Sequence, residues 1–259
     1  MTDDILIEAE HLSRAFGGLV AVDDVSFRVR KGEIVGLIGP NGAGKTTVFN
    51  MVAGSIQPSS GTIRFGDQDV TAMPAHLRAR LGIARTFQIT SVFPALTTLE
   101  NVRAATYRTH SQGWWGALMH SSAWRREETS VHRAAQDALA FCELEDHGGI
   151  KAGALSYGEQ RRLEVAIALA ASPELLLLDE PAAGLNPEEG RKLVGMIQRV
   201  RDRGVTVLLV EHHMRVVMGV CDRIIVLDHG ALIAEGAPDV VANDADVIRV
   251  YFGREKAHA

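Results

Sequence analysis

The hydrophobic positions near the start of the chain follow two kinds of pattern. Residues 25–29 alternate apolar and polar side chains, and residues 33–39 form a short apolar run rich in branched side chains, so we predict a strand at each place. Residues 46–54 have helical spacing and end on a glycine, as helix C-termini often do. This region therefore predicts a strand, a glycine-rich turn and a helix in succession.

Further apolar runs are predicted to be strands, and segments with helical spacing separate several of them. These runs are residues 61–65, 83–87, 175–178, 205–210 and 223–227. Buried strands that alternate with helices are typical of a parallel sheet covered by helices on both faces. The pattern therefore predicts an α/β fold built on a mostly parallel sheet.

Residues 87–155, between the predicted strands, differ from their surroundings in residue composition and pattern. Strand patterns are missing from them, helix formers and polar residues dominate, and all three tryptophans lie in one short span. We interpret the stretch as a helical subdomain inserted into the α/β core. Trp114, Trp115 and Trp124 would either pack inside this subdomain or form a face that docks on the transmembrane subunit or the bilayer surface.

Composition and charge exclude several classes of protein. With 259 residues and 46% hydrophobic side chains the chain can bury a sizeable core, and its formal charge of -5 argues against a general affinity for nucleic acid. The first residues are acidic where a secretory signal is basic, and no apolar run approaches the roughly 18 residues that span a bilayer. Cys142 and Cys221 lie in apolar surroundings without metal-ligand spacing, so we predict that both are buried. We expect a cytoplasmic chain that reaches a membrane only through partners.

The sequence GPNGAGKTT follows the second predicted strand and opens the predicted helix. It matches the phosphate-loop pattern G-x-x-x-x-G-K-[ST] at residues 39–46. In such a loop backbone N–H groups converge on phosphate oxygens, Lys45 offers a positive charge to the outer phosphates, and the hydroxyl of Thr46 can bind Mg²⁺. The loop therefore predicts a nucleoside triphosphate site. Its predicted contacts are Gly39, Pro40, Asn41, Gly42, Ala43, Gly44, Lys45, Thr46 and Thr47.

A second apolar run, LLLLDEP at residues 175–181, ends in two acidic residues. Ligands of an open parallel sheet bind at the carboxyl ends of its strands, where this run delivers its carboxylates. Asp179 suits a Mg²⁺ site, and Glu180, one residue further on, suits a general base for an attacking water. The alternative is that these acids only cap the next helix.

The stretch LSYGE at residues 155–159 also opens a predicted helix. A serine hydroxyl and a glycine N–H group at a helix N-terminus can bind an anion. Taken alone, Ser156 is more typical of an N-cap, with Glu159 three residues on completing a capping box. Both interpretations can hold together.

Together these motifs resemble those of the ATP-binding-cassette ATPases, and the resemblance covers nearly the whole chain. LSYGE is similar to the family's signature motif, RTFQ places Gln88 in the loop that touches Mg²⁺ and the transmembrane partner, and VEHHM places His212 where the family contacts the terminal phosphate. Phe16 is similar to the aromatic residue that stacks on adenine, although a lone aromatic after a strand is usually part of a core. The resemblance implies ATP and Mg²⁺ as cofactors, with Thr46, Gln88 and Asp179 at the metal.

The family also implies an organisation for the chain. A P-loop NTPase core, with an N-terminal antiparallel β portion, would comprise residues 1–88 and 172–240. Residues 89–171 would form the helical subdomain with the signature motif, and residues 241–259 a C-terminal tail.

The resemblance further implies a head-to-tail pair of cassettes. ATP would be sandwiched between one subunit's phosphate loop and the other subunit's Ser156 and Gly158. Lys45, Glu180 and His212 would carry catalysis.

Several stretches narrow the resemblance to the ATPase subunits of bacterial branched-chain amino acid importers. They are LSYGEQRRLEVA, DEPAAGLNP, VEHHMRVVMGVCDRI and the ending VIRVYFG. The implied partners are two transmembrane permease subunits, a second ABC ATPase subunit that is identical or a paralogue, and, indirectly, an extracytoplasmic substrate-binding protein. The implied place is the cytoplasmic face of the inner (plasma) membrane. Open alternatives are the ATPase of a lipid or lipopolysaccharide export system and a non-transport cassette ATPase, whose usual second cassette or long coiled-coil insertion has no counterpart here.

The chain departs from the common family pattern in three places. Tyr157 and Glu159 replace the usual glycine and glutamine of the signature, and Asn186 stands where many members have aspartate. Asn186 carries no charge, so its loop either helps to organise the attacking water or only positions the two chains. His213 has no predicted role, because Glu211 and the two histidines lack the H-E-x-x-H spacing of a zinc helix.

Overall fold

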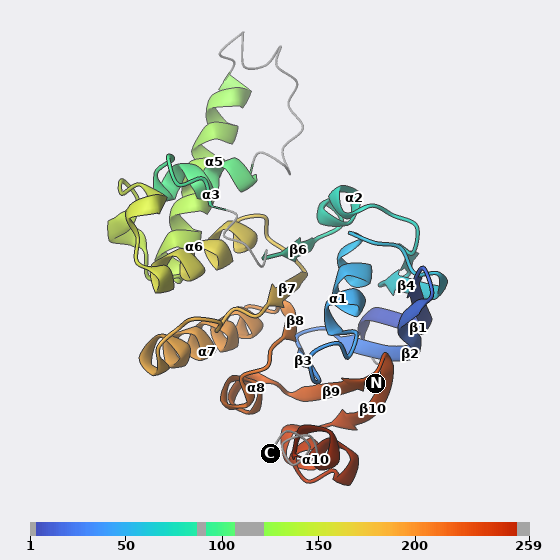
Figure 1. The fold of residues 1–259 in the computed structure, drawn as a ribbon. Coiled ribbons are helices and arrows are strands. Elements are labelled where there is room, and N and C mark those ends of the chain that lie inside the picture. Colours follow the sequence, from blue (N-terminus) through green and yellow to red (C-terminus); the bar gives the residue numbers. More distant parts are fainter. Residues whose placement is uncertain (1–3, 87–91, 107–121, 253–259) are drawn as a thin grey trace. The chain divides into compact units, whose positions relative to one another are not determined.

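The computed structural model describes residues 4–86, 92–106 and 122–252 (Figure 1). The chain divides into two compact units. The first unit contains residues 1–85 and 174–259, and the second contains residues 86–173. Each unit is described by itself.

The first unit is built on a six-stranded sheet with the order β10-β9-β3-β8-β7-β6. Its strands are β3 (Ile34–Ile38), β6 (Ile83–Arg85), β7 (Leu175–Asp179), β8 (Thr206–Val210), β9 (Arg223–Asp228) and β10 (Ala231–Gly236). All neighbours are parallel except β10, which pairs antiparallel with β9. Every residue of β3, β7 and β8 is buried, which explains why these strands read as unbroken apolar runs.

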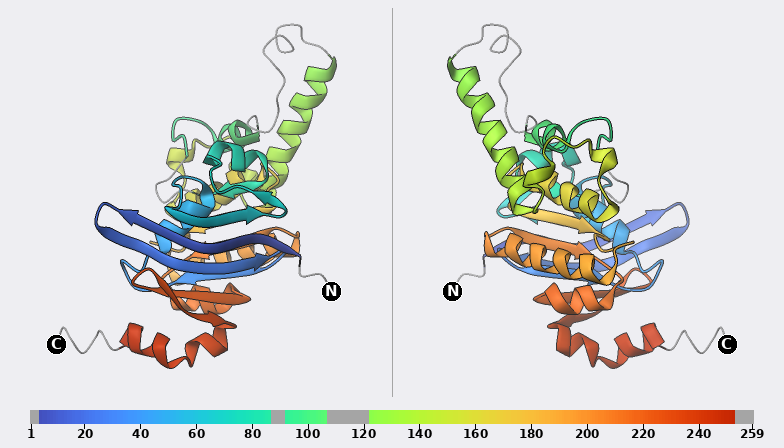
Figure 2. Two further views of the ribbon diagram at one scale, coloured as in Figure 1. Left: turned by 90° about the vertical axis from the view of Figure 1, so that its right-hand side faces the viewer. Right: turned by 90° about the vertical axis from the view of Figure 1, so that its left-hand side faces the viewer.

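A second, antiparallel sheet has the order β2-β1-β4-β5. It contains the long hairpin of β1 (Ile5–Phe16) and β2 (Leu19–Arg30), drawn in blue in Figure 2, together with β4 (Ser60–Phe65) and β5 (Gln68–Asp69). One hydrophobic core joins the inner face of this sheet, helix α1 (Lys45–Ala53) and the six-stranded sheet. The α/β fold with an N-terminal antiparallel portion is confirmed. The sequence patterns missed β1, β5 and β10.

Four helices of the first unit surround the sheets or follow them. They are α2 (Ala75–Arg80), α7 (Pro187–Asp202), α8 (Met214–Val220) and α9 (Pro238–Ala242), and α10 (Ala245–Phe252) ends the described chain.

Arg78 of α2 is fully buried, and its guanidinium donates to the carbonyl oxygens of five residues. These are Met51, Val52, Val70, Thr71 and Met73. Burial lowers the pKa of Arg78 to about 10, and the carboxylate of Asp69 opposes that shift.

The second unit is helical among its described residues. Helices α3 (Thr98–Thr106), α5 (Ser122–Phe141) and α6 (Tyr157–Leu169) pack on one another, and short 3₁₀ turns lie at Glu145–His147 and Ala152–Ala154. The predicted cysteine positions are confirmed, since Cys142 in this unit and Cys221 in the first are both buried and unbonded to each other. Trp114, Trp115 and the side chain of Trp124 lie outside the described residues, so the role of the tryptophans stays a prediction.

Candidate active site

The predicted phosphate loop follows the buried strand β3 and leads into α1. Gly39 (φ 148°) and Gly44 (φ 97°) adopt backbone conformations that L side chains rarely take. A Cβ atom on Gly39 would lie 2.1 Å from the carbonyl oxygen of Leu227, and one on Gly44 would lie 2.5 Å from that of Ala21. Both glycines are therefore required, by backbone conformation and by packing alike.

The N-terminus of α1 is arranged for an anion. The helix begins at Lys45, and its cap residue Gly44 offers no side-chain acceptor to the N–H groups of the first turn. Asn41 and Thr46 are exposed beside these groups. An oxyanion that accepts from these N–H groups would also gain from the helix dipole, which is the arrangement that the sequence predicts for phosphate.

The ammonium group of Lys45 is held inside the loop. Lys45 is 8% exposed, and its Nζ donates to the carbonyl oxygens of Gly39 at 2.7 Å and Pro40 at 2.9 Å. An ammonium has three donors, so one N–H remains for a phosphate oxygen. Burial lowers the pKa of Lys45, while the carboxylates of Glu180 and Asp179 oppose the shift. A bound phosphate would stabilise this buried charge.

Asp179 ends β7 with an acceptor that lacks a donor. Its side chain is 1% exposed, Oδ2 lies 3.3 Å from Nη2 of Arg85, and Oδ1 has no hydrogen-bond partner among the residues that the structure describes. Burial raises the pKa of Asp179, Arg85 opposes that shift, and Glu180 adds to it. A buried carboxylate oxygen without a donor is a suitable ligand for a hard divalent cation such as Mg²⁺, so Asp179 fits the predicted metal site.

Glu180 stands in a strained conformation next to His212. Its φ of 46° is uncommon for a residue other than glycine, and its N–H group donates to the carbonyl oxygen of Val210 at 2.9 Å. The carboxylate Oε1 lies 3.5 Å from Nδ1 of His212, and both side chains are partly exposed. The structure thus brings together two residues that the sequence placed at the ends of different strands.

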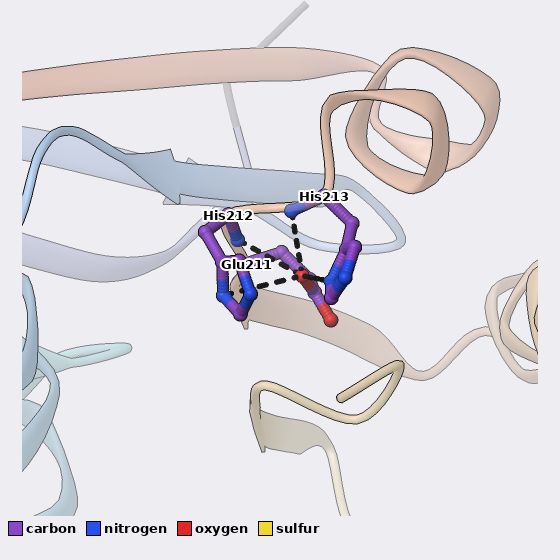
Figure 3. Close-up of side chains that lie close together, drawn as sticks. All are labelled: Glu211, His212 and His213. Carbon is purple, nitrogen blue, oxygen red and sulfur yellow. Dashed lines mark hydrogen bonds and ion pairs between the residues drawn. The ribbon is translucent and has the colours of Figure 1, made fainter. Parts of the chain in front are cut away.

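The segment after β8 contains a buried carboxylate that the sequence analysis did not assign to the site. Glu211 is fully buried and lies between the backbone of Ala182 and the backbone of His212 and His213 (Figure 3). The imidazole rings of the two histidines are 4.2 Å apart between centroids. An acid at the carboxyl end of an apolar run, as Asp179 is in LLLLD, was the signal that could have found Glu211.

Arg85 is a second residue that sequence reasoning missed. It ends β6, and its Nη1 donates to Oδ1 of Asn50 at 2.6 Å while its guanidinium lies 4.8 Å from the ring centroid of Phe49. With its contact to Asp179, Arg85 connects the end of β6 to both α1 and the predicted metal ligand. Gln88 follows three residues later and lies outside the described residues, so its role stays a prediction.

The signature stretch begins α6 in the second unit. Ser156 is the N-cap, its backbone N–H and its hydroxyl donate to Oε2 of Glu159 at 2.8 Å, and the N–H of Glu159 donates back to the serine Oγ. The predicted capping box is confirmed. The hydroxyl of Tyr157 is held by the guanidinium of Arg161, and Gly158 is buried within the helix.

Two other predicted residues have clear surroundings. Phe16 is 45% exposed at the end of β1 with the guanidinium of Arg14 over its ring, so the alternative that it is a core residue is wrong. Asn186 is the N-cap of α7, and its Oδ1 accepts from the N–H groups of Glu188 and Glu189. A neutral amide suffices for that capping role.

The parallel sheet explains why these residues meet. The strands β3, β7 and β8 are parallel neighbours, so the phosphate loop, Asp179 with Glu180, and Glu211 with His212 all leave the same edge of the sheet. An anion site, a metal-binding carboxylate, a candidate base and a histidine at one edge are suited to transfer of a phosphoryl group to water.

Comparison with known proteins identifies the family. Residues 22–183 match the model of the ABC transporter family. The chain belongs to this family. Residues 231–257 also match a model described as branched-chain amino acid ATP-binding cassette transporter.

Relatives and solved structures cover nearly the whole cassette. The high-affinity branched-chain amino acid transport ATP-binding protein LivG of Salmonella typhimurium is 43% identical over 96% of this chain and 98% of its own length. The lipopolysaccharide export system ATP-binding protein LptB of Escherichia coli is 38% identical over the same shares.

Among solved structures, an ABC transporter cassette in its ADP conformation has a TM-score of 0.84 and 30% identity over 96% of this chain and 99% of that one. A dimeric cassette in a post-hydrolysis state with ADP and Pi has a TM-score of 0.75 and 26% identity over 90% and 99%. This chain is therefore an ABC transporter ATPase that binds adenine nucleotide and couples ATP hydrolysis to transport.

Proposed function

We propose that this ATPase is a motor subunit of an importer for branched-chain amino acids. The observation that carries the proposal is the match of residues 231–257, outside the region that matches the ABC transporter model, to the branched-chain amino acid transporter model. The 43% identity with LivG over nearly the whole chain supports the same substrate class. The cassette itself need not touch the amino acid, so the substrate proposal depends on this likeness.

Within the site we propose that ATP binds with Mg²⁺. The loop from Gly39 to Thr47 cradles the phosphates, Lys45 neutralises the outer ones, and Phe16 stacks on adenine. Asp179, Thr46 and Gln88 hold the metal, and the donor-free Oδ1 of Asp179 supports that assignment.

We assign the chemical step to the partly exposed pair at the ends of β7 and β8. Glu180 accepts a proton from the attacking water as general base, and His212 contacts the terminal phosphate. Their proximity, 3.5 Å between Oε1 and Nδ1, places both side chains at one point of the sheet edge. Lys45 stabilises the charge that develops on the phosphoryl group.

The chain works as a head-to-tail pair with an identical cassette or a paralogue. Ser156 and Gly158 of each chain contact the ATP on the other chain's loop. The dimeric post-hydrolysis cassette with ADP and Pi, 26% identical to this chain, supports such a pair. The exposed N-terminus of α6, already ordered by its capping box, supplies the second anion contact.

The pair drives two transmembrane permease subunits at the cytoplasmic face of the inner membrane, and an extracytoplasmic binding protein delivers the amino acid. No helix within residues 4–86, 92–106 and 122–252 is long and apolar enough to cross a membrane. A likeness to LptB at 38% identity makes lipopolysaccharide export the second candidate.

Reconstitution separates the two candidates. The wild-type chain, assembled in proteoliposomes with two permease subunits and a binding protein of a branched-chain amino acid importer, should take up radiolabelled leucine, isoleucine or valine when MgATP is supplied. The Lys45→Ala variant in the same assembly is the matched control and should show no uptake. Lipopolysaccharide release without amino acid uptake would overturn the importer.

A further inference from the structure

Both carboxylate oxygens of Glu211 accept hydrogen bonds from backbone N–H groups. Glu211 is 0% exposed, and Oε1 accepts from the N–H group of Ala182 at 2.9 Å. Oε2 accepts from the N–H groups of His212 and His213, each at 2.9 Å, and lies 3.1 Å from Nδ1 of His213 (Figure 3). A buried charge is stable only when it is paired or fully hydrogen-bonded, and these donors meet that requirement.

The donors come from two segments that follow neighbouring strands. Ala182 is buried and lies in the loop between β7 and α7, two residues after Glu180. His212 and His213 lie between β8 and α8. The N–H of Glu180 donates to the carbonyl oxygen of Val210, so the two segments are joined just before Glu211 and again through its side chain.

We propose that Glu211 is a positioning residue for ATP hydrolysis, whose buried carboxylate clamps the backbone on both sides of the pair formed by Glu180 and His212. This inference rests on the roles that the proposed function gives to those two residues. Because the clamp sets the backbone from which each side chain projects, it sets the 3.5 Å separation of their Oε1 and Nδ1 atoms. It also connects His212 to the loop that ends at the N-cap Asn186 of α7, so that a shift of this loop is transmitted to the histidine.

A metal ion is the competing explanation for this cluster. Ligand atoms of Glu211, His212 and His213 lie within 4.8 Å of one another. However, one carboxylate oxygen already accepts from two backbone N–H groups and the other accepts from a third. A cation at the carboxylate would face the positive ends of these N–H dipoles, so the geometry favours the clamp.

Replacement by glutamine tests the clamp with little change in shape. The amide of Glu211→Gln has one acceptor oxygen and one NH₂ group, which donates only. If the oxygen faces His212 and His213, the NH₂ group opposes the N–H of Ala182, and the reverse orientation opposes two N–H groups. Glu211→Asp keeps the charge but is one methylene shorter, so it cannot reach both segments.

The first measurement is steady-state ATPase kinetics of the full chain. Each of the two variants should lower kcat by about 10-fold to 100-fold, the usual cost of misplacing a catalytic group, with KM and ATP affinity within about threefold of wild type. Glu33→Gln is the matched control, because Glu33 also accepts a backbone N–H, that of Arg30 at 2.9 Å, and pairs with Arg223 at the opposite end of β3. This control should lose stability without a change in kcat.

A double-mutant cycle with His212→Ala then separates positioning from a general structural effect. The loss in kcat caused by Glu211→Gln should be at least fivefold smaller in the His212→Ala background, because a positioning residue has little left to position there. Equal losses in both backgrounds, a wild-type kcat, or a parallel loss of ATP affinity would overturn the clamp. Stoichiometric zinc binding that disappears in Glu211→Gln, measured by calorimetry on the nucleotide-free chain, would also overturn it.

These variants separate a failure of the roles proposed for Glu180 and His212 from a failure of the positioning role of Glu211. If His212→Ala and Glu180→Gln keep the wild-type kcat, the assigned roles of those residues are wrong. If both have a strongly reduced but measurable kcat while Glu211→Gln and Glu211→Asp are fully active, the clamp alone is wrong.

Discussion

In the second unit, the signature helix α6 begins with hydrogen bonds between residues close in sequence. In the first unit, the catalytic edge, where the phosphate loop, Glu180 and His212 lie, is held by hydrogen bonds between segments far apart in sequence. Glu159 accepts from Ser156 three residues earlier, and its side chain is 24% exposed. Glu211 accepts from Ala182, 29 residues away in sequence, and is fully buried. Both carboxylates hold the start of a segment by charge-assisted hydrogen bonds to N–H groups.

Local and long-range hydrogen bonds differ in how much stability is lost when one partner is removed. A local cap forms with the helix itself, so loss of its acid removes about 1 kcal/mol at most sites and leaves the fold unchanged. When a buried residue that bonds distant segments is removed, water cannot replace it. Its former hydrogen-bond partners, backbone N–H or carbonyl groups, are then left unsatisfied. We therefore expect changes at the catalytic edge to have larger effects than changes at the signature cap, in the following order.

Lys45→Ala should have the largest effect at the catalytic edge. It removes the buried charge beside the phosphate loop, so ATP hydrolysis should be abolished and nucleotide binding greatly weakened without unfolding. The measurement is the rise in melting temperature on addition of MgATP, which binding to the folded state alone produces. Lys192→Ala, at an exposed lysine paired with Glu188, is the control and should keep the full rise. A wild-type rise in Lys45→Ala would refute the assignment.

Arg78→Met should be the most destabilising change that leaves the site residues in place. It removes the donors to five carbonyl oxygens, two of them near the C-terminus of α1, so we expect a loss of about 3–5 kcal/mol in the free energy of unfolding, measured with urea. Arg64→Met removes an exposed arginine that donates to one carbonyl, that of Asp67, and should cost under about 0.5 kcal/mol. Similar losses of unfolding free energy in both variants would show that the buried hydrogen bonds of Arg78 contribute no more stability than an exposed one.

Glu180→Gln should produce an ATP-bound dimer whose formation also depends on the signature stretch. Loss of the base should slow hydrolysis by at least about 10²-fold, so ATP persists and the variant should sediment as a dimer in MgATP and as a monomer without it. Adding Ser156→Arg should abolish that dimer while ATP binding to the monomer survives, because the phosphate loop is intact. If the natural mate is a paralogue, both chains are needed in the experiment. A dimer that tolerates Ser156→Arg would mean that the signature stretch is only a capped helix.

Glu159→Gln should have the smallest effect and a specific pH dependence. Hydrogen bonds from the backbone N–H and the hydroxyl of Ser156 lower the pKa of Glu159 below its ordinary 4.5. A lowered pKa in the folded state gives stability that is present above the unfolded pKa and is lost as the pH falls through the folded value. The variant should therefore be less stable than wild type by about 1 kcal/mol or less at pH 7, and the difference should shrink as the pH falls below 4.5 and through the lowered pKa of Glu159. A constant difference across this range, measured by thermal unfolding, would contradict the role of the ionised carboxylate.

Much of the fold could be predicted because its strongest signals are local. Strands β3, β7 and β8 are covered on both faces, so burial favours apolar side chains along them, and the polar residues Asp179 and Thr206 stand only at strand ends. The strands that escaped prediction, β1, β5 and β10, have exposed or half-buried positions and no such run. The same limit applied to Phe16, whose exposure depends on what packs around the hairpin end.

The sequence by itself determined the phosphate loop, the acids after β7 and the capping box of Ser156 with Glu159. Each is a pattern within a few residues, whose chemistry follows from backbone geometry and helix termini. Only the tertiary structure decided which carboxylate Arg85 meets, 94 residues away, and which loop Glu211 holds. The physical reason is that strand order and parallel register bring these groups to one edge of the sheet, and neither is recorded in any short stretch of the chain.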